Sequence, residues 1–275
     1  MIYTSENFQP QNRAFLFGDA VKVYFFIRNS QLIMAEECYF FLMASMRKMR
    51  MNIPLSYTLE YFQELFGKEV ISKGMQNGII HFLVYRNSAD QSLQNQAKRI
   101  LTEGKKSSVS FWFEAVEKED VLSLQHPVEM DLMKEIGVNT NLLSNIRVHC
   151  PENIYAEIYA QENDLDDVIL LNPNKRIARS IYGNLMFLEG KTIKVPKQTE
   201  GAYISPLMEN LITYIHRNNL AEIEPSEMIA FESQKAEEIL MISDEKGIFP
   251  VSKIRNKNFE NQRFSEMIEK WKTGF

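Results

Sequence analysis

The sequence predicts an α/β fold of mixed α+β character that is divided into two domains. The chain has 275 residues, which is long enough for two hydrophobic cores. Apolar runs with the period of a strand alternate along it with segments that have the period of a helix. The composition is 45% hydrophobic and 24% charged, as in an ordinary globular protein without long linkers. We place the domain boundary near Glu117, which gives domains of residues 1–117 and 118–275.

The first domain is expected to contain a hairpin, two helices and two further strands. Aromatic and β-branched residues from Val21 to Ile33 predict the hairpin, which turns at Arg28-Asn29-Ser30. Apolar residues at helical spacing follow, and we expect this helix to end at Pro54 and the next to start near Ser56. Two buried strands are then separated by a polar connection, residues 88–106. The strand sequences are "NGIIHFLVYRN" and "SSVSFWFEAVEKE".

The second domain is expected to alternate helices and strands. Pro151 suits the first turn of a helix, and the strand "DDVILLN" follows it. Ser205 is a good N-cap and Pro206 a good first helical residue for the next helix. A short helix is predicted within "PSEMIAFESQKAEE", then a strand, a loop and a strand in "ILMISDEKGIFPVSKI".

Charge and cysteine content exclude several classes of protein. The formal net charge of -5 gives no basic field for a nucleic acid. Cys38 and Cys150 are too few for a disulfide framework or a metal site. We expect no signal peptide, because the sequence contains no long apolar span. We therefore expect a cytoplasmic protein that binds neither nucleic acid nor membranes.

Four sequence blocks carry a resemblance to a known family. "NRAFLFGD" (Asn12 to Asp19) is the most specific, and "NKRIARSIYGNLMF", "EGAYISPLMENLI" and "ILMISDEKGIFPVSKI" follow in the same order. The chain resembles the fold-type IV family that depends on pyridoxal phosphate (PLP). This family includes branched-chain aminotransferases, D-amino-acid aminotransferases and 4-amino-4-deoxychorismate lyase. The resemblance implies the two-domain fold of these enzymes, a homodimer, and a cofactor cleft between the domains.

The catalytic lysine of the family has no counterpart in this chain. The resemblance places Arg147 where the lysine that forms the Schiff base belongs, and no lysine occurs between Lys134 and Lys175. A guanidinium stays protonated and delocalises its charge, so it offers no nucleophilic amine to an aldehyde.

Other cofactor contacts of the family are also altered. The carboxylate that pairs with the pyridine nitrogen aligns with Arg179, and a phosphate-binding arginine aligns with Phe41. The phosphate-binding turn at a helix N-terminus aligns with Ser205, Pro206 and Leu207; this proline has no N–H and this leucine has no hydroxyl.

The last phosphate contact aligns with Asp244 and Glu245, which would repel a dianion. Arg147, Arg179 and these two acids introduce charges of both signs at positions of one former pocket. Because buried charges are costly unless they are paired, we expect at least one ion pair among the four side chains.

The histidines and cysteines give weaker signals. His81, His126, His149 and His216 are scattered without metal-ligand spacing, so we expect structural or exposed roles and no metal site. His149 beside Cys150 suggests a Cys–His nucleophile, but adjacent residues rarely meet in the required geometry and no third group orients them.

Three hypotheses follow. The first is a pseudoenzyme that keeps the family fold, has lost PLP, and binds an unidentified small molecule or has a structural role. The second is an active PLP-dependent aminotransferase or 4-amino-4-deoxychorismate lyase, in which Lys175 or Lys197 reaches the cofactor. The third is an enzyme that reuses the cleft without a cofactor. We favour the first, because the altered positions are independent of one another.

Overall fold

The computed structural model describes residues 1–4, 12–87 and 108–275. They divide into two units: Met1–Val121 with Ile146–His149, and Leu122–Asn145 with Cys150–Phe275. The first unit extends past Glu117 and takes in a short segment from later in the chain. The polar connection expected at residues 88–106 lies outside the described residues.

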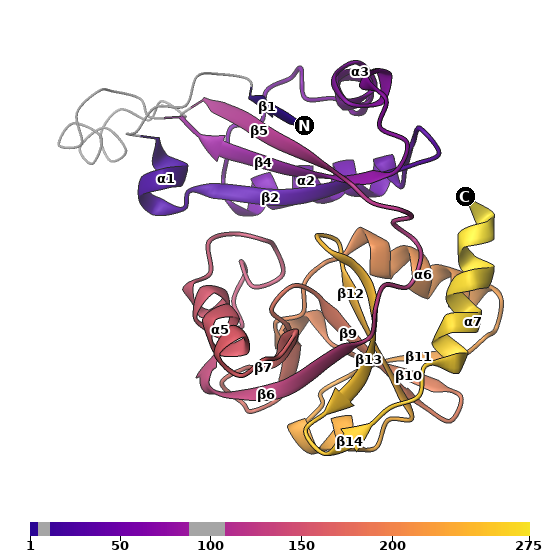
Figure 1. The fold of residues 1–275 in the computed structure, drawn as a ribbon. Helices are drawn as coiled ribbons and strands as arrows, with labels where there is room; N and C mark the ends of the chain where they lie inside the picture. The colour runs from indigo at the N-terminus through magenta and orange to yellow at the C-terminus, as the bar shows by residue number, and fades with distance from the viewer. Residues whose placement is uncertain (5–11, 88–107) are drawn as a thin grey trace. The chain divides into compact units, whose positions relative to one another are not determined.

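The first unit is built on a five-stranded antiparallel sheet in the order β1-β5-β4-β2-β3 (Figure 1). The predicted hairpin is confirmed, since β2 and β3 are joined through Asn29 and Ser30, both in the left-handed backbone region. The strands are β1 (Ile2–Thr4), β2 (Ala20–Arg28), β3 (Gln31–Ile33), β4 (Gly78–Arg86) and β5 (Val109–Glu117).

Helices α1 (Arg13–Phe17), α2 (Ala35–Lys48) and α3 (Leu59–Glu69) and the 3-10 turn η1 (Ile71–Lys73) complete this unit. Two helix limits differ from those expected. Helix α2 ends at Lys48, well before Pro54. Helix α3 begins after Thr58, whose hydroxyl accepts a hydrogen bond from Tyr61 N at 3.2 Å; Ser56 lies before the helix.

An aromatic cluster joins α3 to one face of the sheet. The Phe66 ring of α3 lies 4.8 Å from Phe25 and 5.8 Å from Phe82, centroid to centroid. Such contacts add to the free energy of burying the rings. Because side chains alternate along a strand, Lys22 and Tyr24 of β2 lie on the opposite face from Phe25.

The second unit contains a mixed nine-stranded sheet. Its main path runs β11-β10-β9-β12-β13-β6-β7-β8, and β14 pairs with β13. The pairs β10–β11, β13–β6 and β6–β7 are parallel and the others antiparallel, so the expected mixed α/β character is confirmed. The strands are β6 (Val128–Gly137), β7 (Asp167–Leu171), β8 (Ile177–Ser180), β9 (Asn184–Glu189), β10 (Thr192–Pro196), β11 (Glu222–Ser226), β12 (Glu238–Ser243), β13 (Gly247–Ile254) and β14 (Lys257–Asn258).

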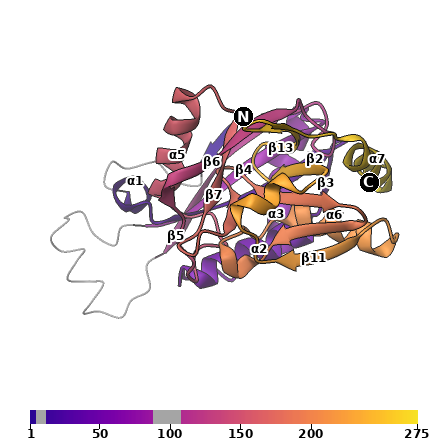
Figure 2. The ribbon, with the colours of Figure 1, turned by 90° about the horizontal axis from the view of Figure 1, so that it is seen from below.

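The helices of this unit pack against the sheet (Figures 1 and 2). Helix α5 (Pro151–Glu162) buries Ala156 and Ala160 against an apolar cluster that includes Val168 and Leu170 of β7. Helices α6 (Pro206–Arg217) and α7 (Gln262–Trp271) lie side by side, and Trp271 Nε1 donates to Asn210 Oδ1 at 3.0 Å. The short 3-10 elements of this unit are η2 (Gln198–Glu200), η3 (Ala230–Gln234) and η4 (Lys272–Gly274).

The helix predicted at residues 225–238 is reduced to η3, because Pro225 and Ser226 pair with β10 as the end of β11. Within the described residues, no helix combines the length and the apolar character needed to cross a membrane.

Candidate functional site

The N-terminus of α6 holds a carboxylate of the chain itself. Ser205 is the N-cap and accepts a hydrogen bond from Met208 N at 3.1 Å, as expected from the sequence. Asp244, in the turn between β12 and β13, accepts hydrogen bonds from Ser205 Oγ at 2.8 Å and from Leu207 N at 3.2 Å. Asp244 is only 2% exposed. The carboxylate thus satisfies a free backbone N–H and lies at the positive end of the helix dipole.

The other residues at this helix start offer little to an external anion. Pro206 occupies the first helical position and has no N–H to donate. The Leu207 side chain is fully buried in the core. A phosphate at this helix start would need the Leu207 N–H that Asp244 already uses.

Arg179 is a buried cation without a carboxylate partner. It is 3% exposed, and none of the acidic residues in the described chain forms an ion pair with it. One guanidinium nitrogen donates to Ser180 O at 3.0 Å, and another lies 3.7 Å from Cys150 Sγ. The Tyr203 ring stacks under the guanidinium, with Cζ 4.2 Å from the ring centroid. Arg179 Nε is buried and has no hydrogen-bond partner among the described residues.

Tyr203 is a site residue that the sequence did not reveal. Its backbone N–H donates to Asn184 Oδ1 at 2.9 Å, and its carbonyl accepts from Asn184 Nδ2 at 2.8 Å. Its hydroxyl accepts from Asn153 Nδ2 at 3.0 Å. These bonds fix the ring under Arg179. The local sequence "GAYISP" does not predict these hydrogen bonds, because Asn153 and Asn184 are distant from Tyr203 in the sequence.

Arg179, Tyr203 and Cys150 form one cluster of contacting side chains. Cys150 does not form a Cys–His nucleophile. The thiol lies 3.2 Å from Glu152 Oε2 and 3.4 Å from Asn153 Oδ1, and within the described chain no hydrogen bond joins it to His149. Burial raises the pKa of the Cys150 thiol, and the nearby Arg179 only partly opposes this shift. The thiol is therefore a poor nucleophile at neutral pH.

Arg147 lies in the first unit, in the segment Ile146–His149 beside β2. Lys22 N donates to Arg147 O at 2.8 Å, which makes a single antiparallel bridge to the strand. The guanidinium Cζ lies 5.4 Å from the centroid of the Tyr24 ring, and the residue is 7% exposed. Backbone pairing and an aromatic face thus hold this side chain in place. Phe41, which we expect to replace a phosphate-binding arginine of the family, is buried in α2.

The expected ion pair is tested only in part. Arg179 shares its unit with Asp244 and Glu245, and within the described residues no ion pair joins it to either of them. Arg147 lies in the other unit, and its pairing with either acid stays a prediction. In the second unit, Lys246, which follows Glu245, places its Nζ 3.2 Å from the centroid of the Tyr182 ring.

Lys175 and Lys197, the lysines that an active enzyme would need, make no contact with Arg179, Tyr203 or Cys150 among the described residues. Lys197 Nζ is ion-paired with Glu227 Oε1 at 3.0 Å. Lys175 is exposed in the turn between β7 and β8, where its φ of 60° places it in the left-handed region.

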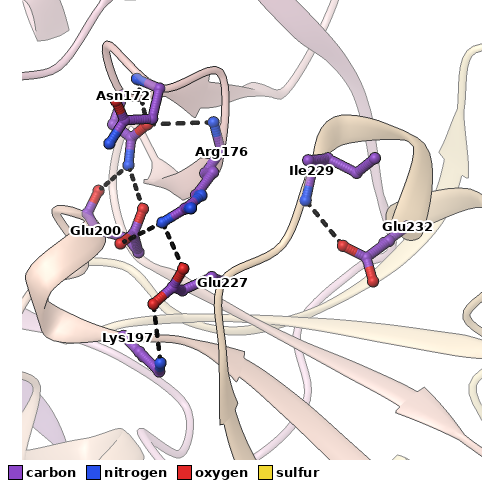
Figure 3. Close-up of polar contacts among 8 residues, drawn as sticks. Asn172, Arg176, Lys197, Glu200, Glu227, Ile229 and Glu232 are labelled. Atoms are coloured by element: carbon purple, nitrogen blue, oxygen red, sulfur yellow. Dashed lines mark hydrogen bonds and ion pairs between the residues drawn. The ribbon is translucent and has the colours of Figure 1, made fainter.

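A polar network supports the segment that leads into α6 (Figure 3). Asn172 Nδ2 donates to Glu200 Oε2 at 2.6 Å and to Glu200 O at 3.2 Å. Arg176 bridges the buried Glu200, at 3.3 Å, and Glu227, at 2.5 Å. This network ties the β7–β8 turn to η2, which precedes Tyr203 and Ser205.

Each of the four histidines has its own surroundings within its unit. His81 lies edge-on to Tyr24, with ring centroids 5.2 Å apart, and His126 packs against Phe249 at 5.6 Å. His149 and His216 are exposed. Over residues 1–4, 12–87 and 108–275, no cluster of three His, Cys, Asp or Glu side chains suits a metal ion.

Comparisons with solved structures identify the fold. A protein from Legionella pneumophila, provisionally named a 4-amino-4-deoxychorismate lyase, is 18% identical with a TM-score of 0.82, over 98% of this chain and 96% of its own. The branched-chain amino acid aminotransferase of Escherichia coli is 13% identical with a TM-score of 0.84, over 100% and 93%. That of Thermobaculum terrenum, solved in its PLP form, is 15% identical with a TM-score of 0.82, over 98% and 88%.

No curated protein matches the chain by sequence. The family model described as amino-transferase class IV matches residues 42–254, which is most of the chain. The predicted fold and the predicted resemblance are therefore confirmed. The chain belongs to the class IV aminotransferase family.

Proposed function

We propose that this family member is a pseudoenzyme that has lost covalent PLP binding, and with it transamination and lyase activity. In this proposal it acts as a homodimer that binds a small molecule without a covalent cofactor. The observation that carries the proposal is the position of Asp244, whose buried carboxylate accepts hydrogen bonds at the N-terminus of α6.

The Asp244 carboxylate is incompatible with a phosphate at the same helix start. Two anions within about 4 Å repel each other by several kcal/mol at the effective dielectric of a protein surface, and by more in the interior. Moving Asp244 away would leave the hydroxyl of Ser205 and the N–H of Leu207 without their acceptor. The residues present therefore do not fit the phosphate group of PLP.

The two arginines support the same proposal on separate grounds. In our alignment with the family, Arg147 takes the place of the lysine, and a guanidinium provides no amine for covalent attachment. Arg179 takes the place of the carboxylate that pairs with the pyridine nitrogen. A buried guanidinium beside that nitrogen disfavours its protonation, which the cofactor needs to withdraw electrons.

Cofactor retention tests the proposal directly. The purified protein is incubated with excess PLP and desalted, its visible absorbance is recorded, and it is then treated with borohydride and mapped by peptide mass spectrometry. An active class IV aminotransferase treated identically is the control. We expect no retained absorbance band and no lysine carrying a reduced adduct.

A stoichiometric adduct on one lysine would overturn the proposal. Adduct on Lys175 or Lys197 would instead support an active aminotransferase or 4-amino-4-deoxychorismate lyase. Adducts spread weakly over exposed lysines would indicate non-specific reaction of the aldehyde and would leave the expected result intact.

A further inference from the structure

Arg179 is a buried cation that the described part of its unit leaves unbalanced. The side chain is 3% exposed, and no carboxylate among the described residues lies within ion-pair distance of it. Burying an unpaired charge costs far more free energy than burying an apolar side chain of similar size, and a guanidinium cannot lose its proton to avoid this cost. Proteins break the rule that buried charges are paired mainly at functional sites.

The hydrogen bonds of Arg179 are also incomplete. A guanidinium has five N–H groups. Within the described residues, Arg179 uses one of them for Ser180 O, at 3.0 Å, and one for Cys150 Sγ, at 3.7 Å. Its Nε is buried and has no acceptor in that part of the chain. With two of the five used, three N–H groups of a planar fork remain, and such a fork suits a planar oxyanion.

The guanidinium is held in a fixed orientation. The Tyr203 ring stacks under it, with Arg179 Cζ 4.2 Å from the ring centroid. Tyr203 is fixed in turn by hydrogen bonds to Asn184 through its backbone and to Asn153 through its hydroxyl. All four residues belong to the second unit. Because a binding group that is already oriented loses little conformational freedom, Arg179 is a preorganised receptor for an anion.

The neighbours of Arg179 restrict the ligand to a small ion with one negative charge. Of the three groups that contact the guanidinium, Ser180 and Tyr203 are buried and only Cys150 is partly exposed, so a ligand approaches past the thiol. An arginine so enclosed admits an ion of a few atoms. Glu152 Oε2 lies 3.2 Å from the Cys150 thiol and would repel a second negative charge.

We propose that Arg179 binds a small planar monoanion, of the kind represented by formate, nitrate and bicarbonate, beside the Cys150 thiol. Two N–H groups of the guanidinium donate to two oxygens of the ion, and the ion balances the buried positive charge. This names a ligand class for the small molecule that the proposed function leaves unidentified, and in that respect it rests on the proposed function.

Cys150 can report binding, because its thiol lies beside Arg179 and Cys38, the other cysteine, is fully buried. The PLP-free protein is alkylated with the neutral reagent iodoacetamide at constant ionic strength, and peptide mass spectrometry gives the rate at Cys150. An anion on Arg179 covers the thiol and cancels the positive charge that favours the thiolate. We expect formate and nitrate to slow alkylation saturably, roughly three- to tenfold, since the thiolate fraction sets the rate.

Two further probes separate anion binding from other solute effects. Formamide has nearly the shape of formate but no charge, and sulfate is tetrahedral with two charges. Neither should protect Cys150 at the same concentration. Urea unfolding gives a second measurement that does not depend on the thiol: at ten times its dissociation constant, formate should raise the ratio of folded to unfolded protein about tenfold relative to chloride.

Variants assign the effect to the guanidinium. Arg179→Met should be alkylated at a rate that formate no longer changes. Arg179→Lys keeps the charge but lacks the two-donor fork, so its affinity for formate should fall roughly tenfold. Lys191→Met removes an exposed cation of the same unit and should respond to formate as the wild type does.

Three outcomes would overturn the proposal: formate changes neither the alkylation rate nor the stability of the wild type, formamide or sulfate protects as well as formate, or Arg179→Met responds like the wild type. The wild-type series decides the question even where a variant fails to fold. Cofactor retention is measured separately. A lysine adduct of PLP together with formate protection of the PLP-free protein would refute the proposed function alone, and no adduct with no protection would refute the anion site alone.

Discussion

At the scale of single residues, Asp244 is the anion that the N-terminus of α6 requires. We expect Asp244→Ala to lower the free energy of unfolding by about 2 kcal/mol. The Ser205 hydroxyl and the Leu207 N–H lose their acceptor, and the helix dipole loses the anion at its positive end. Urea denaturation measures the change. Inorganic phosphate at constant ionic strength should stabilise this variant and leave the wild type unaffected.

Glu245→Ala is the control for Asp244, because it removes the neighbouring carboxylate, which is partly exposed. We expect a loss below about 0.5 kcal/mol. Equal losses for the two variants would mean that the position of Asp244 at the helix contributes nothing of its own.

Arg176, which directly precedes β8, and Arg179, which lies within β8, should respond in opposite directions to replacement by methionine. Arg179 is buried without a carboxylate, so Arg179→Met should leave the free energy of unfolding unchanged or raise it by up to about 2 kcal/mol. Arg176→Met breaks ion pairs with Glu200 and Glu227 and should lower it by about 1 kcal/mol, a figure reduced because Arg176 is partly exposed. Chemical denaturation of both variants gives the comparison. A large loss for Arg179→Met would show that its contacts with Tyr203 and Ser180 outweigh the cost of burial.

Asp167, the first residue of β7, predicts a dependence of stability on pH. Burial raises the pKa of its carboxyl from 3.8 to about 6, although Val168 N donates to it at 2.6 Å and Ile181 N at 2.9 Å. The folded state therefore binds more protons than the unfolded state between these two pH values. The Asp167 carboxyl therefore contributes about 3 kcal/mol to the free energy of unfolding below about pH 4, and this contribution is lost as the pH rises through 6. Unfolding of the wild type and of Asp167→Asn across this range measures it; parallel pH profiles would contradict the assignment.

At the scale of elements, the start of α3 gives a test with a matched control. Thr58 caps the helix through Tyr61 N, so Thr58→Ala should lower the free energy of unfolding by about 1 kcal/mol. Ser56, the residue that the sequence favoured, is exposed and lies outside the helix, so Ser56→Ala should cost less than about 0.3 kcal/mol. Thermal or urea unfolding distinguishes the two. Reversed magnitudes would place the N-cap at Ser56.

The end of α2 shows why some limits could not be predicted from sequence. Arg50 adopts φ of 53°, Arg50 N donates to Arg47 O at 2.9 Å, and Met51 N donates to Met46 O at 2.9 Å. This is a Schellman motif, in which glycine normally occupies the left-handed position that Arg50 takes here. Arginine in that position gives no sequence signal, and the apolar periodicity continues to Ile53, so the sequence predicts a helix longer than the one observed.

The alternation of strands and helices and the cap at Ser205 were predictable, because periodicity and local hydrogen bonding determine them. The surroundings of Asp244 and Tyr203 were not, because their partners lie 19 to 50 residues away in sequence. The resemblance to the family led us to expect altered cofactor contacts at Arg147, Arg179 and Asp244. It did not indicate that Asp244 would cap α6.

At the scale of the whole molecule, we predict a homodimer. The expectation comes from the family, and exposed apolar side chains such as Phe15, Ile154 and Ile158, each more than half exposed, are consistent with further burial. Sedimentation equilibrium should give about twice the chain mass of 32.1 kDa. A single species of 32.1 kDa at all protein concentrations would exclude the dimer.

The chain has two tryptophans, and each unit contains one of them. Trp112 is partly exposed on β5, whereas Trp271 is 1% exposed at the end of α7, so their emission spectra should differ. Variants that keep one indole at a time would therefore report the melting of each half of the protein separately. Coincident transitions would mean that the halves unfold as one cooperative system, and separated transitions would mean that one half can lose its structure while the other persists.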